Sequence, residues 1–202
     1  EPWHLGEEVV SVFRKMVEIR YRLIPFLYTQ AVLSSRRGLP MIRPIFMHFP
    51  EDPTSWCIED QYLLGEHLLV APLFDSKTER KVYLPENSYW INYLTGTVHK
   101  GGKWHNITAN EIPGILLVKS GVIIPHAALA QHTRDIDWSK LYLKRYTHEE
   151  SEAAGNLALP STKKEIFLQA VKHGQGGWKM KTDTSGMEFI FMDDGDRLND
   201  EL

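Results

Sequence analysis

The chain has 202 residues, of which 43% are hydrophobic and 24% charged, a composition typical of a globular protein with a sizeable core. A formal net charge of −3 excludes the concentrated basic surface that a nucleic acid or an anionic membrane would require. The single cysteine, Cys57, excludes an internal disulfide and a cysteine-based metal site, and no apolar run approaches the ~20 residues of a membrane span.

The N-terminal segment combines an unusual start with a strong helical pattern. Residues 1–3, EPW, are neither an initiator methionine nor a signal peptide, so we expect the chain to begin inside a longer protein, and its compartment stays open. From Glu7 to about Arg37, apolar residues recur at spacings of three and four, which predicts an amphipathic helix. Pro25 should kink this helix or split it in two, and Gly38 with Pro40 should end it.

The segment after the helix is predicted to be a buried strand, Met41 to Phe49, because its apolar run is closed by Pro50. A helix followed by one buried strand is half of a βα repeat and cannot bury both of its own faces. We therefore infer that the rest of a sheet or barrel precedes this chain. A short helical piece is expected next, from Ile58 to Leu64, ending at Gly65.

From Leu68 onward, short apolar runs alternate with turn signals, which predicts an antiparallel β-sandwich. The expected strands are Leu68 to Phe74, Arg80 to Leu84, Tyr89 to Tyr93, Thr97 to His99, Gly114 to Val118 and Val122 to Pro125. In the last third they are Leu141 to Leu143, Ile166 to Leu168, Trp178 to Lys181 and Met187 to Met192. Glu149 to Gly155 is interpreted as a loop, and Asp193 to Leu202 as a polar, acidic tail.

Several blocks of sequence are specific enough to indicate a family: EPWHLGEE, RYRLIPFLYTQA, GLPMIRPIFMHFPEDP, DQYLLGEHLLVAPLF, VYLPENSYWINYLTG and IPGILLVKSGVIIPH. In this order, over residues 1–126, they resemble the C-terminal part of glycoside hydrolase family 31, the α-glucosidases and α-xylosidases. The later block FIFMDDGD resembles the acidic turn of the family's distal β-domain. Residues 127–188 carry no such block and are assigned by position only.

The resemblance implies an α+β fragment that begins with the last helix and strand of a (β/α)8 barrel and continues into an antiparallel β-sandwich and the start of a second β-domain. The barrel end is expected over residues 1–55, the proximal C-terminal β-sandwich over 56–130 and a partial distal β-domain over 131–202. On this likeness, residues 7–37 would be the seventh barrel helix and residues 42–47 the eighth barrel strand.

The resemblance also implies a reaction, the hydrolysis of α-linked glycosides with retention, which needs two carboxyl groups about 5–5.5 Å apart. In the family, both carboxylates and a substrate-binding histidine precede the EPW-like block. We therefore expect no catalytic residue in this chain, no activity from the chain alone and no cofactor. The full-length protein is expected to be a family 31 glycosidase acting on an α-linked oligosaccharide or glycoside.

Two residues are candidates for a substrate site, and each has a structural alternative. Trp3 follows the position of the family's active-site histidine and is a candidate for shaping the sugar pocket, with plain packing as the default interpretation. Arg43 lies near the start of the expected eighth strand, and a buried arginine must be paired. It is a candidate for orienting a carboxylate of the barrel, with a structural ion pair as the default interpretation.

Other polar groups favour structural interpretations, and no metal site is expected. The adjacent acids Glu51 and Asp52 should point apart in a structural turn, and Asp193-Asp194 should form a solvated turn rather than a calcium loop. The histidines near strand ends, His67, His99, His105 and His126, are interpreted as ordinary, partly exposed side chains.

The remaining motifs leave a second function open. Aromatic residues around a predicted hairpin favour sandwich core, but they also allow a stand-alone carbohydrate-binding, structural or oligomerisation module; they are Tyr89, Trp90, Tyr93 and Trp104. Asn106-Ile107-Thr108 is a glycosylation sequon, which matters only in a secreted eukaryotic protein. Without a barrel wall, the apolar face of residues 7–37 should be exposed, which predicts homo-oligomers or aggregates.

Overall fold

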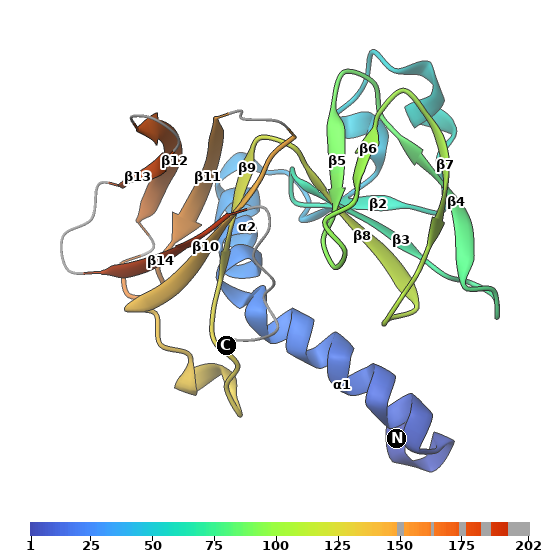
Figure 1. The fold of residues 1–202 in the computed structure, drawn as a ribbon, viewed down its shortest axis with the longest axis horizontal. Coiled ribbons are helices and arrows are strands. Elements are labelled where there is room, and N and C mark those ends of the chain that lie inside the picture. Colours follow the sequence, from blue (N-terminus) through green and yellow to red (C-terminus); the bar gives the residue numbers. More distant parts are fainter. Residues whose placement is uncertain (149–151, 163, 174–176, 183–186, 194–202) are drawn as a thin grey trace. The chain divides into compact units, whose positions relative to one another are not determined.

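The chain is built mainly of β-strands with two α-helices (Figure 1). The computed structural model describes residues 1–148, 152–162, 164–173, 177–182 and 187–193. Internal contacts divide the chain into two compact units. Unit 1 consists of Glu1–Arg20 and Ile42–Lys119, and unit 2 of Tyr21–Met41 and Ser120–Leu202. None of the described helices is long and apolar enough to span a membrane.

The predicted helix and its split are confirmed. A 3-10 helix, Pro2–Leu5, precedes α1 (Glu7–Arg22), and α2 (Ile24–Arg37) follows after a break at Leu23. Pro25 lies in the first turn of α2, where a missing backbone N–H needs no helical partner. Gly38 has a φ of 67°, in the left-handed region, and its N–H donates to the carbonyl of Ser34, which ends the helix.

The strand predicted over Met41 to Phe49 is largely wrong. Strand β1 is only Ile42–Arg43, and Ile45–Met47 form a 3-10 helix. Pro44 lacks the N–H that would continue the strand ladder, so the apolar run turns back and buries Ile45 instead of extending. β1 pairs antiparallel with β2, and its assignment to a barrel stays a proposal.

The helix predicted over Ile58 to Leu64 is also wrong. The helical turn lies earlier, at Pro53–Cys57, and Tyr62–Leu64 form β2. The apolar residues Tyr62–Leu64 are extended because β2 is an inner strand, paired with β1 on one side and β3 on the other. Gly65 does end the element, with a φ of 66° that suits the turn into β3.

Unit 1 contains a six-stranded sheet in the order β1-β2-β3-β8-β5-β6 and a two-stranded sheet of β4 and β7. All of its strand pairs are antiparallel. The strands after β2 are β3 (Leu68–Pro72), β4 (Glu79–Leu84), β5 (Tyr89–Asn92), β6 (Val98–Lys100), β7 (Lys103–Thr108) and β8 (Gly114–Lys119). The sequence analysis missed β7, because Ile107 is its only buried side chain.

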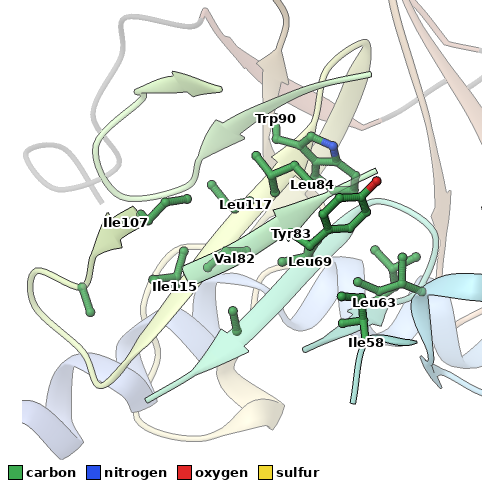
Figure 2. Packing of buried hydrophobic residues seen from close by; sticks show 13 residues of the cluster. Ile58, Leu63, Leu69, Val82, Tyr83, Leu84, Trp90, Ile107, Ile115 and Leu117 are labelled. Atoms are coloured by element: carbon green, nitrogen blue, oxygen red, sulfur yellow. The ribbon is translucent and has the colours of Figure 1, made fainter. Parts of the chain in front are cut away.

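The core of unit 1 lies between these two sheets. Figure 2 shows its buried side chains, which come from both sheets and include Leu69, Val82, Trp90, Ile107 and Leu117. Burial of such side chains contributes about 1.5–3 kcal/mol each. This sheet-rich, two-layer packing confirms the sandwich character that the strand pattern predicted.

The described part of unit 2 contains α2 and a six-stranded sheet in the order β13-β12-β11-β9-β10-β14. Its strands are β9 (Val122–His126), β10 (Lys140–Tyr146), β11 (Ala153–Ala158), β12 (Glu165–His173), β13 (Gly177–Thr182) and β14 (Glu188–Met192), with a 3-10 helix at Thr133–Asp135. The pairs β10–β14 and β9–β11 are parallel, whereas the others are antiparallel. The loop predicted over residues 149–155 is wrong from Ala153 on, since small residues there form β11.

Helix α2 packs against β9 and β11 of unit 2 (Figure 1). Thr29 anchors it: its hydroxyl donates to the carbonyl of Pro25 at 2.7 Å and accepts the N–H of Ala158 at 2.9 Å. The core of this unit includes Ile123 and Leu143 from neighbouring strands. The acidic tail beyond residue 193 lies outside the described residues.

Candidate functional site

Arg43, at the end of β1, is completely buried inside unit 1 although it always carries a positive charge. Its Nη1 lies 2.6 Å from His48 Nε2 and 3.5 Å from Glu66 Oε1. Because a guanidinium can only donate, His48 Nε2 is the acceptor and the imidazole is neutral, with its proton on Nδ1. The Glu66 carboxylate supplies the opposite charge that a buried cation requires.

Two imidazoles beside this arginine have depressed pKa values. Burial and, secondly, the charge of Arg43 lower the pKa of His48. Burial lowers the pKa of His67 to about 4, although the Glu66 charge acts in the opposite direction. Lys119 completes the group: its backbone N–H donates to the carbonyl of His67 at 2.9 Å, and its Nζ lies 5.3 Å from the Phe49 ring centroid. We call Arg43, His48, Glu66, His67 and Lys119 the Arg43 cluster.

The Arg43 cluster holds a buried cation between one carboxylate and one imidazole. It contains one carboxylate, from Glu66, whereas retaining glycoside hydrolysis needs two that flank the scissile bond. Among the described residues, no group of three or more histidine, cysteine or acidic side chains could hold a metal ion. What the arrangement can do is fix the end of β1 to the 3-10 turn and to the β2–β3 turn.

The structure places Trp3 in quite different surroundings. It lies on the 3-10 helix Pro2–Leu5, its side chain is 64% exposed, and its ring meets that of His4 edge-on at 6.1 Å. Trp3 is therefore an open aromatic surface, whereas Arg43 is sealed inside unit 1. The roles predicted for these two residues in substrate binding stay predictions.

Asp52 is confirmed as part of a structural turn. Its carboxylate accepts hydrogen bonds from the backbone N–H of Thr54 at 3.0 Å, from the backbone N–H of Glu86 at 3.1 Å and from the Tyr83 hydroxyl at 2.8 Å. Burial and this hydroxyl–carboxylate bond raise the pKa of Tyr83 above its ordinary value. The neighbouring Glu51 is exposed, whereas Asp52 is buried, so the two acids lie in different surroundings.

One interpretation of the histidines is wrong. His126 is not partly exposed but fully buried, and its Nδ1 donates to the carbonyl of Ile124 at 2.9 Å. Burial and, secondly, the charge of nearby Lys144 lower its pKa to about 3. The residue ends β9, an inner strand between β11 and β10 whose five residues are all buried.

The aromatic hairpin is confirmed as core for two of its four residues. Trp90 is fully buried and Tyr93 is 5% exposed, so neither can present a ring to a sugar. Tyr89 is half-buried, and Trp104 is the most exposed of the four, at 50%. A carbohydrate-binding surface made of all four residues is thus excluded.

Asp193 pairs with an arginine, and its neighbour Asp194 lies outside the described residues. Arg145 Nε donates to Asp193 Oδ1 at 2.9 Å, and the same guanidinium lies 4.0 Å from the ring centroid of Trp178. Within the described residues, Asp193 serves as the partner of a strand β10 arginine.

The sequence analysis did not single out His48 or Glu66 as partners of Arg43. His48 approaches Arg43 only because the 3-10 turn at Ile45–Met47 folds the chain back on itself. Glu66 reaches it because β1 and β2 pair antiparallel and the next turn carries Glu66 alongside. The spacing of five residues between Arg43 and His48 predicts their contact only when the 3-10 turn between them is known.

Comparisons with known proteins identify related sequences and structures. Residues 1–30 match the model of the glycosyl hydrolases family 31 TIM-barrel domain, and residues 38–124 match that of the glycosyl hydrolase family 31 C-terminal domain. Alpha-glucosidase 2 of Bacillus thermoamyloliquefaciens is 34% identical over 61% of this chain, which corresponds to 16% of that protein. An alpha-xylosidase of Saccharolobus solfataricus is 31% identical over 72% of this chain, or 20% of its own length.

A solved structure of similar fold is that of a family 31 dextranase from Flavobacterium johnsoniae, determined in complex with glucose. It matches 95% of this chain and 26% of its own chain, with a TM-score of 0.80 and 25% sequence identity. The chain thus spans a fifth or less of the length of these two curated relatives.

Proposed function

We propose that this chain, which belongs to glycoside hydrolase family 31, is the C-terminal part of a retaining α-glycosidase that hydrolyses α-linked glucosides or xylosides. The observation that carries the proposal is the order of the two family matches: residues 1–30 to the barrel domain and residues 38–124 to the C-terminal domain, in direct succession. The names of the relatives, α-glucosidase and α-xylosidase, support the substrate class.

The proposal assigns separate roles to the parts of the chain. Residues 1–55 would form the end of the catalytic barrel, residues 56–130 the proximal β-sandwich and residues 131–202 part of the distal β-domain. Both reactive carboxylates would lie outside these 202 residues. The ion pair between Arg43 and Glu66 and the fully engaged Asp52 support this view, because these acids already serve structural hydrogen bonds or ion pairs.

The experiment compares the 202-residue chain with the full-length product of the same gene, using p-nitrophenyl α-glucoside and α-xyloside. We expect turnover with the full-length protein and none with the chain alone. Turnover that copurifies with the isolated chain would overturn the proposal. A full-length protein that hydrolyses neither glycoside would overturn the substrate class.

Within the full-length enzyme, Trp3 would line the sugar pocket and Arg43 would act as a positioning residue. The 64% exposure of Trp3 supports its availability to a ligand. Trp3→Ala should raise KM with little change in the thermal midpoint, whereas Arg43→Lys should lower kcat and also destabilise unit 1. A Trp3→Ala enzyme with unchanged KM would remove Trp3 from the pocket.

A further inference from the structure

The outer face of β7 carries a short row of exposed side chains. Along the strand, Trp104, Asn106 and Thr108 are exposed, whereas His105 is half-buried and Ile107 is buried. Alternate residues of a strand point to the same face, so the three exposed side chains line one surface, with neighbours about 6.6 Å apart. This face belongs to the two-stranded sheet of β4 and β7 in unit 1.

The same residues complete a modification motif. Asn106-Ile107-Thr108 matches Asn-X-Thr, and it is the single Asn-X-Ser/Thr motif in the 202 residues. Both the amide side chain that would be modified and the threonine hydroxyl that the motif requires are exposed on the folded strand. A glycan on Asn106 would therefore meet no packed side chain that it must displace.

Trp104, two residues before Asn106, is held as a platform beside it. Its ring lies 5.4 Å from that of Tyr83, its cross-strand partner, at an interplanar angle of 57°, yet half of the side chain remains exposed. Tyr83 is itself fixed, because its hydroxyl donates to the Asp52 carboxylate. An indole supported on one side and open on the other offers an apolar face to a sugar ring.

We propose that Asn106 is an acceptor for an N-linked glycan and that the first sugar lies on the indole of Trp104. In the transfer, Asn106 Nδ2 forms a bond to C1 of the sugar of a lipid-pyrophosphate-linked oligosaccharide. The bond between C1 and the pyrophosphate oxygen breaks, the lipid pyrophosphate leaves with the electron pair, and the amide loses one proton to the base of the transferase. Trp104 and Asn106 lie on the same face of the strand, which puts the indole within reach of an attached ring.

The test is to secrete the chain from a eukaryotic cell behind a signal peptide and to measure the intact mass before and after peptide N-glycosidase treatment. We expect a glycan mass that is lost on treatment, with Asn106 converted to aspartate in the released peptide. Asn106→Gln and Thr108→Ala should both abolish the added mass, whereas the matched control Thr108→Ser should retain it. A secreted protein without glycan at Asn106 would overturn the proposal.

The role of Trp104 has its own readout. Removal of the glycan should lower the thermal midpoint of the native protein by about 2 °C. This shift should vanish in Trp104→Ala and in Trp104→Leu, which keeps apolar bulk on Tyr83, and should persist in Trp104→Phe. If Trp104→Ala is not secreted, the pair Trp104→Leu and Trp104→Phe decides the question. The same shift in the leucine and phenylalanine variants would show that the sugar does not use the aromatic face.

Discussion

Each of the two units buries an arginine, but they surround it differently. In unit 1, Arg43 has no exposed surface, and its partners His48 and Glu66 lie within 23 residues of it along the chain. In unit 2, Arg145 is 5% exposed and pairs with Asp193, which lies 48 residues away and whose side chain is 51% exposed. Arg43 is thus enclosed by turns that are close to it in the chain. Arg145 is instead paired with a partly exposed residue that is distant in the chain.

The contrast shows that burial of a charge alone does not decide its importance for stability. When a buried cation is removed, the cost falls on the partner that keeps its charge, and Glu66 is only 23% exposed. Asp193, whose side chain is 51% exposed, can replace much of its interaction with Arg145 by hydration. The two arginines therefore make a matched pair for experiment.

The largest effect is expected from Arg43→Ala, which removes the cation facing Glu66 and His48 and leaves a cavity. We expect a loss of about 3–5 kcal/mol in the free energy of unfolding of unit 1. Arg145→Ala is the control, with an expected loss of about 1–2 kcal/mol from a half-exposed ion pair and the contact with Trp178. Peptide-resolved hydrogen exchange separates the units, and equal losses would contradict the comparison.

A smaller loss is expected from Asp52→Ala in the polar interior of unit 1. This change takes the acceptor away from the Tyr83 hydroxyl and from the backbone N–H groups of Thr54 and Glu86. We expect a loss of about 2–3 kcal/mol, against about 1 kcal/mol for Tyr83→Phe, which deletes one donor. Urea denaturation measures both, and a Tyr83→Phe loss as large as that of Asp52→Ala would assign the stability to the tyrosine instead.

Acidification should weaken both units below the ordinary histidine pKa of 6.5. His48, His67 and His126 all have lowered pKa values in the folded chain, so protonation favours the unfolded state. The stability is complete above pH 6.5 and declines as the pH falls, down to about 4 for His67 and about 3 for His126. Each histidine contributes at most about 1.4 kcal/mol per pH unit.

His48→Gln sharpens this pH prediction, because glutamine still offers an oxygen acceptor to Arg43 but does not titrate. The charged groups around His48 are Arg43, Glu66 and Lys119, and they remain in the variant. We expect the pH dependence of unit 1 to become shallower while that of unit 2 is unchanged. Hydrogen exchange at pH 7.5 and about pH 5 measures the change in stability of each unit with pH. If the change in unit 1 is the same in the native chain and in His48→Gln, His48 is not the titrating group.

The smallest effect on stability is expected on α1, where Phe13 and Met16 are 49% and 45% exposed. Phe13→Ser should change the free energy of unfolding by less than about 0.5 kcal/mol. It should nevertheless reduce self-association of the chain in light scattering, because exposed apolar surface drives association. The exposed Arg14→Ser is the control, and a native chain that stays monomeric at high concentration would contradict the predicted oligomer.

Periodic segments could be predicted from sequence, and irregular polar contacts could not. The split at Leu23 follows from Pro25 in the sequence. The strands rich in Val, Ile and Leu follow from the local hydrophobic pattern. Strands β7 and β11 were not predicted, because most of their residues are polar or small. The partners of Arg43 escaped because they depend on a 3-10 turn and on strand register, neither of which hydrophobic spacing encodes.

One side chain in unit 1 imitates a strand. Gln61 Nε2 donates to the carbonyl of Tyr83 at 2.6 Å, and Gln61 Oε1 accepts the N–H of Tyr83 at 2.9 Å. These two bonds are those that a neighbouring strand would make to β4, whose other side is already paired with β7. The amide thereby occupies the Tyr83 end of an edge at which another chain could add a strand, and strand addition there would have to displace Gln61.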